Sequence, residues 1–269
     1  MICVEVALKA EAGPLIEALE LKSLSGNHLF PIWENDQIKL IISGVGKVKA
    51  GAACSYLAAI HRDEDIYGWL NVGIGGHQIH RVGTPLLIHK IIDEGRHSSF
   101  FPSFVFTPPC QTDVCLTVEQ PEHKYESGYV YDMEAAGFYA IASKLSPLEM
   151  IHVFKVISDN LKQPATELNK KVVEKLIADH VELLQKILTE MRGLIDEIAP
   201  MSVPFLDECL KKWHFTTYET HQLKNLLQRW QLLCPDQVLF SQDFTSQKSA
   251  KEALNFLEKH LKNLSLPLS

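Results

Sequence analysis

The sequence predicts an α/β domain built on a parallel or mixed sheet, followed by a helical extension. Over roughly the first 195 residues, short apolar runs alternate with helical patterns, which is typical of α/β domains. The chain has 269 residues, of which 46% are hydrophobic and 22% charged, as in ordinary globular proteins. A chain of this length can bury a large core without disulfides. Beyond residue 200 the pattern becomes helical only.

The first five elements alternate strand and helix. Apolar runs predict the strands, and segments with helical periodicity lie between them. In chain order we expect strand 2–8, helix 10–19, strand 37–43, helix 49–61 and strand 67–73. The third strand is expected to run into a turn that carries Gly73, Gly75 and Gly76, because glycine clusters commonly mark turns.

The second half of the domain repeats this alternation. Apolar runs predict strands over 82–93, 113–118 and 148–158. The segment 97–112 is rich in proline, serine and aromatic residues, and we interpret it as a loop that closes over something. The period changes from two to about 3.6 near Asp132, which is expected to cap the helix that follows. Helix is then expected from 166 to 192 without interruption, because apolar residues form one stripe.

Residues 1–199 are expected to form the α/β domain and residues 200–269 a helical C-terminal extension. In the extension, the apolar faces of 217–233 and 249–264 are too wide to leave in water. We therefore expect them to pack on the first domain, on a second subunit or on an outside partner.

Composition excludes several classes of function. The 26 basic and 33 acidic residues give a net charge of −7 without a basic run, so a nucleic-acid partner is not expected. No apolar stretch is long enough to span a membrane, and the N-terminus lacks the pattern of a secretion signal, so we expect a cytoplasmic protein. Neither the six scattered cysteines nor the twelve histidines form a metal-binding pattern; His77 and His80 come closest. No phosphate-binding loop is present, and no cofactor is expected.

Polar residues directly after the predicted strands are the candidates for chemistry, because ligands of open α/β sheets bind at the carboxyl ends of strands. They are Glu11, the glycine turn from Gly73 to His77, Met133 with Glu134, and Ser158 with Asp159. Each alone has an ordinary structural explanation. The two glutamates suit the first turn of a helix, and Asp159 suits a cap or a turn.

Five segments together resemble one family in order and spacing. They are ALKAEAGPL (7–15), SGVGKVKAGAA (43–53), NVGIGGH (71–77), VYDMEAAGFYAIA (130–142) and KVISDN (155–160). They resemble the successive motifs of the nucleoside phosphorylase and nucleosidase superfamily, most closely its methylthioadenosine/S-adenosylhomocysteine nucleosidase branch. The resemblance covers about residues 1–195. It implies a three-layer α/β/α sandwich around a twisted mixed sheet, a homodimer, and cleavage of the N-glycosidic bond of a purine nucleoside.

The resemblance also implies roles for single residues. Glu11 matches the acid that activates the attacking water, and Glu134 the carboxylate that holds the ribose hydroxyls. Met133 matches the residue packed on the ribose. Asp159 matches the acid that protonates the purine at N7, with Ser158 beside it. These residue types suit the reaction, since bond cleavage develops positive charge on the sugar and negative charge on the base. Gly75 of the glycine turn is expected to contact the substrate.

The sequence departs from the family pattern at several places. Ile74 stands where the nucleosidases usually have serine, and the stretch 94–129 is short for the family. Within it, Phe101, Phe104, Phe106 and Tyr125 are candidates for the wall of a purine site, although aromatic residues in such a loop are more often core.

The chain also lacks the phosphate anchors of the phosphorylase branch, having Asn71 and Ile74 at those positions, so water is the expected nucleophile. Two alternatives stay open. One is a phosphorylase that binds phosphate through Lys47, Lys49 or Arg81, because phosphate recognition needs cationic or hydroxyl donors. The other is a nucleoside-binding or interaction module without catalysis. The residues also leave open the 5′ substituent and the base of the substrate.

Overall fold

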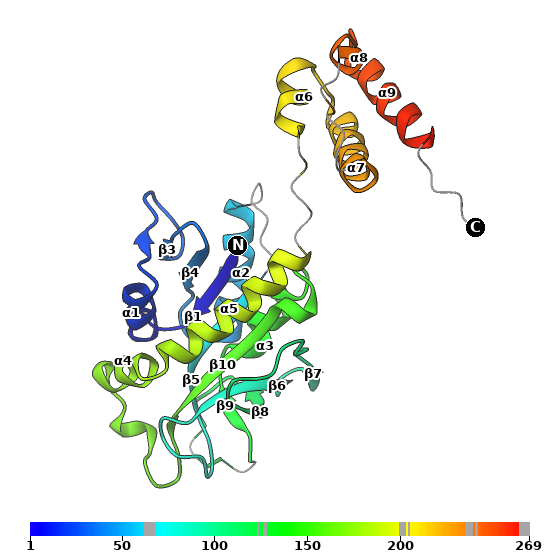
Figure 1. Ribbon diagram of the computed structural model, residues 1–269. Helices are drawn as coiled ribbons and strands as arrows, with labels where there is room; N and C mark the ends of the chain where they lie inside the picture. The colour runs from blue at the N-terminus through cyan, green and yellow to red at the C-terminus, as the bar shows by residue number, and fades with distance from the viewer. Residues whose placement is uncertain are drawn as a thin grey trace, which may run out of the picture. The chain divides into compact units, whose positions relative to one another are not determined.

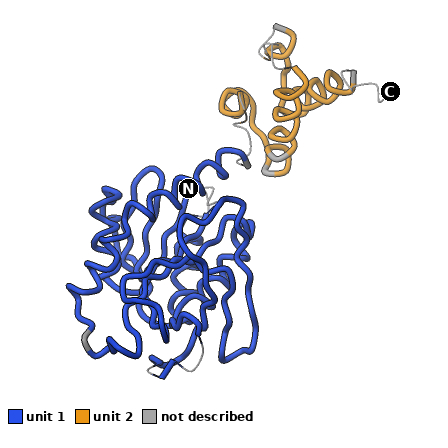
Figure 2. The backbone as a smooth tube through the Cα atoms, turned by 60° about the horizontal axis from the view of Figure 1, so that its bottom comes forward, with its two compact units in different colours: residues 1–198 blue, residues 199–269 orange. Residues whose placement is uncertain are grey.

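The computed structural model describes residues 1–61, 68–122, 124–125, 128–198, 203, 205–234, 239 and 242–263. The chain divides into two compact units, residues 1–198 and 199–269 (Figure 2). The predicted boundary at residues 199 and 200 lies outside the described residues.

Unit 1 is built on a mixed sheet of ten strands (Figure 1). The strands are β1 (Ile2–Val6), β2 (Lys22–Ser23), β3 (Ile32–Glu34), β4 (Ile38–Ile42), β5 (Gly68–Gly76), β6 (Pro85–Asp93), β7 (Ser98–Phe100), β8 (Gln111–Thr117), β9 (Val130–Asp132) and β10 (Ile151–Asp159). Their order is β10-β6-β8-β9-β5-β1-β4-β3-β2, with β7 paired to β6. Strand β10 also pairs with β5, so the strands β10, β6, β8, β9 and β5 close into a ring. The short strands β2, β3 and β7 were not among the predicted elements.

Helices cover both faces of the sheet. Helices α1 (Lys9–Ala18), α4 (Lys170–Ala178) and α5 (Val181–Ile198) pack together on one face. Helices α2 (Lys47–Ile60) and α3 (Ala135–Ala142) pack together on the other (Figure 1). Two short 3₁₀ turns, Leu148–Met150 and Ala165–Glu167, flank β10. The predicted three-layer α/β/α class is confirmed. None of the helices in the described ranges combines the length and the apolar composition needed to cross a bilayer.

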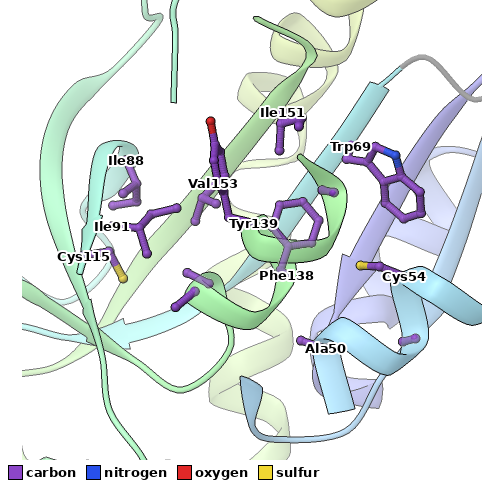
Figure 3. Packing of buried hydrophobic residues seen from close by; sticks show 14 of the residues in the cluster. Ala50, Cys54, Trp69, Ile88, Ile91, Cys115, Phe138, Tyr139, Ile151 and Val153 are labelled. Carbon is purple, nitrogen blue, oxygen red and sulfur yellow. The ribbon is translucent and has the colours of Figure 1, made fainter. Parts of the chain in front are cut away.

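The hydrophobic core under α2 and α3 holds these layers together. Phe138 and Tyr139 of α3 and Cys54 of α2 are buried against the sheet, where they meet Trp69 of β5 and Val153 of β10 (Figure 3). The two helices approach so closely that a Cβ atom on Gly137 would lie 1.9 Å from the carbonyl oxygen of Lys47. Glycine is therefore required at this contact.

The predicted helix 166–192 is wrong in one respect, because the chain forms two helices there. Helix α4 ends at Ala178 with Asp179 as its C-cap residue, and α5 begins at Val181. Between them, the His180 ring nitrogen Nε2 lies 2.7 Å from the carbonyl oxygen of Gly83. This contact joins residues 97 positions apart, so the local apolar stripe does not reveal it.

The predicted glycine turn after the third strand is also wrong. Strand β5 continues through Gly76 and pairs with β10 as far as Asp159. Glycine is needed here because neighbouring atoms leave no room for a side chain, and not because the chain turns. A Cβ atom on Gly75 would lie 2.8 Å from Val130 Cγ1, and one on Gly76 would lie 2.8 Å from Asp159 Oδ2.

The N-cap residue of α3 is Glu134, two residues after the predicted Asp132. Asp132 still serves this helix end, since its Oδ2 accepts a hydrogen bond from the backbone N–H of Ala135 at 2.8 Å. The strand therefore ends and the helix begins where the change of period predicts. The carboxylate of Asp132 accepts a hydrogen bond from one of the backbone N–H groups that have no partner within the first turn of the helix.

Unit 2 is helical and has its own hydrophobic core. It contains α6 (Leu206–Lys212), α7 (Thr217–Leu233), α8 (Gln242–Thr245) and α9 (Ala250–Asn263). Trp213, Leu227, Phe244 and Leu257 are among the residues of this core, and all of its members belong to unit 2. Within unit 2, the described apolar residues of α7 and α9 pack on one another in this core.

Candidate active site

A cavity of about 270 Å³ opens at the carboxyl ends of β1, β5, β9 and β10. Its walls include the six residues for which the sequence resemblance implies a role at the substrate: Glu11, Gly75, Met133, Glu134, Ser158 and Asp159. Gly73 and His77 of the predicted turn do not line it. The six residues come from segments almost 150 residues apart in the chain, so the fold brings the predicted residues together. Apolar side chains such as Leu8, Val45 and Leu168 complete much of the lining.

Glu11 joins the start of α1 to β5. Its Oε2 accepts a hydrogen bond from the backbone N–H of Leu8 at 2.8 Å, and its Oε1 accepts one from Ile74 at 3.0 Å. The first contact is a helix-capping interaction, as the ordinary structural explanation holds. Burial raises the pKa of Glu11 to about 7, although Lys155 and the two backbone donors act in the opposite direction. Glu11 can therefore exchange a proton near neutral pH.

Glu134 is held by the turn before α2. Its Oε1 accepts a hydrogen bond from the backbone N–H of Gly46 at 2.8 Å. Gly44 and Gly46 have φ values of 83° and 111°, which favour glycine, so the GVG sequence permits the turn that aims this N–H at Glu134. Burial raises the pKa of Glu134, and Lys155 partly offsets this effect.

Lys155 of β10 is a central residue that the sequence reasoning did not single out. Its Nζ lies 2.8 Å from Asp132 Oδ2. Burial alone would lower the pKa of Lys155, but the carboxylates of Asp132 and Glu134 outweigh burial and raise it. An added Cβ atom on Gly73 would lie 3.2 Å from both Lys155 Nζ and Glu11 Oε1, so the lysine approaches Glu11 as well. A lysine inside the apolar run of a buried strand was the signal that could have revealed it.

A further acidic group, Glu5, lies in the sheet on β1 and does not line the cavity. Its side chain is fully buried on β1, with Oε1 2.5 Å from Ser43 Oγ and Oε2 2.5 Å from Asn71 Nδ2. Ser43 Oγ also lies 2.8 Å from the carbonyl oxygen of Gly44. Ser43 and Asn71 thus each donate to one oxygen of the Glu5 carboxyl group. Burial raises the pKa of Glu5 to about 7, although these two hydrogen bonds act in the opposite direction.

Asp159 accepts hydrogen bonds from two hydroxyl groups. Ser158 donates to its Oδ1, and Tyr125 donates to its Oδ2. The backbone carbonyl of Asp159 also accepts the N–H of His77 at 3.0 Å, which ties the end of β10 to the residue after β5. The side chain of Asp159 forms part of the cavity wall beside Gly75 and Gly76.

The other aromatic candidates lie elsewhere. Phe104 and Phe106 pack on the ring of His152, with centroid distances of 5.7 Å and 5.0 Å, at the amino end of β10. Phe101 is 62% exposed and does not line the cavity. The loop 97–112 therefore covers His152. None of the three candidate phenylalanines lines the cavity, and Phe104 and Phe106 pack on a buried residue instead, the alternative that the sequence analysis also gave.

One group of possible metal ligands occurs among the described residues. Ligand atoms of His77, His80 and Asp113 lie within 4.8 Å of one another. However, His77 Nδ1 accepts the backbone N–H groups of Ile79 and His80, each at 3.0 Å, so the ring proton resides on Nε2. Nε2 faces the carbonyl oxygen of Gly128 at 3.2 Å, to which it donates. This tautomer leaves His77 without a lone pair for a metal, which argues against a metal centre.

The sequence matches no protein-family model and no curated protein. The fold, by contrast, matches solved structures closely along their length. A 5′-methylthioadenosine nucleosidase from Arabidopsis thaliana aligns with a TM-score of 0.61 and 16% identity over 71% of this chain and 96% of that chain. A 5′-methylthioadenosine/S-adenosylhomocysteine nucleosidase from Neisseria meningitidis, solved with methylthio-immucillin-A, gives a TM-score of 0.57 and 16% identity over 70% and 98%.

Futalosine hydrolase from Helicobacter pylori gives a TM-score of 0.53 and 15% identity over 70% of this chain and 97% of that chain. Unit 1 therefore has the fold of the nucleosidases that the sequence resembles. At these identities the likeness establishes the fold alone.

Proposed function

We propose that this chain hydrolyses the N-glycosidic bond of a purine nucleoside, of the 5′-substituted adenosine type, and releases the free base. The observation that carries the proposal is the meeting of Glu11, Glu134 and Asp159 around one cavity. The neighbouring folds support it, because they include nucleosidases for 5′-methylthioadenosine and a futalosine hydrolase. The apolar lining from Leu8, Val45 and Leu168 suits an uncharged 5′ substituent.

In the proposed mechanism, Glu11 accepts a proton from water while the water oxygen attacks C1′ of the ribose. The ionised form of Glu11 is required for this step. Its pKa of about 7 places a large fraction of the group in that form at neutral pH, and its protonated form after the attack is also stable. The two backbone donors, Leu8 and Ile74, fix the direction of the carboxylate.

Glu134 and Asp159 act on the two sides of the breaking bond. Glu134 accepts hydrogen bonds from ribose hydroxyls, and its negative charge favours the positive charge that develops on the sugar. The electron pair of the C1′–N9 bond moves to the purine, and Asp159 supplies a proton to N7. Met133 packs on the ribose, and Ser158 holds the carboxyl group of Asp159.

Water is favoured over phosphate as the nucleophile. A phosphorylase must bind an inorganic dianion with cationic or hydroxyl donors. Neither lysine nor arginine occurs among the described residues that line the cavity. Of the alternative anchors, Lys47 lies 2.6 Å from Asp93 and 2.7 Å from Glu119, outside the cavity wall, and neither Lys49 nor Arg81 lines it.

A panel of nucleosides tests the proposal. Methylthioadenosine, S-adenosylhomocysteine, adenosine and inosine would be incubated with the full chain, with and without phosphate, and free base and sugar product measured. The expected result is base release with free ribose or its 5′-substituted form, independent of phosphate. Phosphate dependence with a sugar 1-phosphate product would favour the phosphorylase. If none of the nucleosides releases its base, the non-catalytic binding module is the alternative that stays.

We also propose a homodimer. Val45, which lines the cavity two residues before α2, and Val48, in the first turn of α2, are 41% and 79% exposed, and exposed apolar side chains so close in the chain suit a subunit contact. Light scattering on the full chain would distinguish a dimer from a monomer.

A further inference from the structure

Tyr125 is the residue outside the proposed machinery that makes the most direct contact with it. Its hydroxyl donates to Asp159 Oδ2, while Ser158 donates to the other carboxylate oxygen. A carboxylate has about four lone-pair positions, so these two bonds leave positions free toward the cavity that Asp159 lines. Tyr125 therefore touches the proposed acid without lining the cavity.

The surroundings are shaped for this contact. Tyr125 is 2% exposed, and its ring packs edge-on against Tyr131 at a centroid distance of 5.7 Å. A Cβ atom on Gly76 would lie 2.5 Å from Tyr125 Cε1, so only glycine at this position of β5 leaves room for the ring. The backbone of Tyr125 has a φ of 48°, an unfavourable value for a bulky residue. Such a conformation persists where the surrounding structure holds it, and it occurs preferentially at functional sites.

We propose that Tyr125 is a positioning residue for departure of the base, acting through its hydrogen bond to Asp159. The inference rests on the proposed nucleoside hydrolysis. Tyr125 fixes the orientation of the carboxyl group that must deliver the proton. It does not itself deliver the proton, because burial and the neighbouring Asp159 both raise the pKa of Tyr125, which makes it a poor acid and a lasting donor.

The expected effect follows from geometry. A general acid transfers its proton well only when its carboxyl group points at the atom that receives the proton. Ser158 and Tyr125 each hold one oxygen of Asp159. Removing the Tyr125 hydroxyl should therefore leave one oxygen unheld and lower the turnover number.

The test is Tyr125→Phe in the full chain, with kcat and KM for base release measured. Tyr139→Phe is the matched control, since Tyr139 is equally buried and its hydroxyl lies 3.5 Å from the carbonyl oxygen of Phe101, away from the cavity. We expect kcat to fall by about tenfold in Tyr125→Phe with KM nearly unchanged, and neither constant to change in Tyr139→Phe.

Asp159→Asn provides the second arm. Because Tyr125 is proposed to act through Asp159, Tyr125→Phe should cause no further loss of kcat when combined with Asp159→Asn, whereas a merely structural role would lower kcat in both backgrounds. An active parent whose kcat is unchanged in Tyr125→Phe would overturn the positioning role and leave the proposed hydrolysis intact. A parent that releases no base from any nucleoside would overturn both.

Discussion

Lys155 Nζ lies 2.8 Å from Asp132 Oδ2, and the two side chains are 1% and 0% exposed. This fully buried ion pair stands under a cavity whose other ionisable groups are predominantly carboxyl groups. Burial alone would raise the pKa of Asp132, but Lys155 and the hydroxyl of Thr117 hold it below its ordinary value. The lysine thus compensates the negative charge that the site concentrates.

Lys155→Met should destabilise the protein strongly. The substitution keeps the length of the side chain but leaves Asp132 and Glu134 buried without their cation, and breaking a buried ion pair in this way costs about 3–5 kcal/mol. Urea unfolding at pH 7 measures the change. Lys170→Met is the control, because Lys170 is 75% exposed and its pair with Glu174 is worth well under 1 kcal/mol. Equal effects of the two substitutions would contradict the central role of Lys155.

The rising limb of activity should reflect Glu11. Since the ionised carboxylate accepts the proton of water, kcat/KM is expected to rise with pH through about 7, where burial places the pKa of Glu11. Glu11→Gln should remove this limb and lower turnover by about 10²-fold or more. Glu17→Gln, an exposed change on the same helix, should leave the profile unchanged. A rising limb that persists in Glu11→Gln would assign the base to another group.

Glu134→Gln should weaken both turnover and recognition of the ribose. A carboxylate can accept from two hydroxyls with charge-assisted bonds, whereas an amide has only one accepting oxygen. A 2′-deoxynucleoside already lacks one partner, so it should lose less activity in the variant than the ribonucleoside does. Steady-state kinetics on a matched pair of substrates measures the difference. Identical losses would show that Glu134 does not read the sugar.

Asp159→Asn should lower base release by about 10²- to 10⁴-fold, the usual contribution of a general acid, because the amide keeps the size of the side chain but not its transferable proton. Nucleoside binding, measured by calorimetry, should largely survive. Asp179→Asn, at the exposed C-cap of α4, serves as the control and should retain full activity. Full activity in Asp159→Asn would refute its role.

Glu5→Gln should stabilise the protein at alkaline pH. Burial raises the pKa of Glu5 from 4.5 to about 7 on folding, so the folded state holds a proton that the unfolded state releases between these values. Stability from this group is complete below about pH 4.5 and is lost as pH rises through 7, by about 3 kcal/mol. The glutamine side chain of the variant does not ionise, so the variant does not lose this stability at high pH. Urea unfolding at pH 5 and pH 8 should therefore show the gain of the variant at pH 8 only, and a gain of equal size at both would contradict it.

The alternating apolar runs were sufficient to predict the main strands and helices of unit 1, because burial on a sheet leaves a local pattern in sequence. They could not predict the break between α4 and α5, since the contact of His180 with Gly83 joins distant segments. Gly75 and Gly76 suggested a turn, because glycine clusters commonly mark turns. In the structure, glycine is needed there because Val130 and Asp159 lie too close to leave room for a side chain, and this closeness exists only in the folded chain.

The candidate site, like the fold, could be predicted only in part from the sequence. The order of the polar residues after the strands predicted which side chains line the cavity, because parallel strands bring their carboxyl ends together. Their protonation could not be predicted, since the pKa of Glu11 depends on burial and on Lys155, which comes from a strand read only as apolar. Tyr125 was a candidate for the purine wall and instead contacts Asp159, a pairing that no spacing reveals.

The ring of strands in unit 1 also limits where a strand of another chain could add to the sheet. In β10, backbone groups pair with β5 on one side and β6 on the other, so this part of the sheet offers few unpaired N–H and C=O groups on which a foreign strand could add. At the opposite end, the described sheet finishes in β2, an exposed strand of two residues that carries Lys22. Short, charged edges of this kind discourage edge-to-edge aggregation.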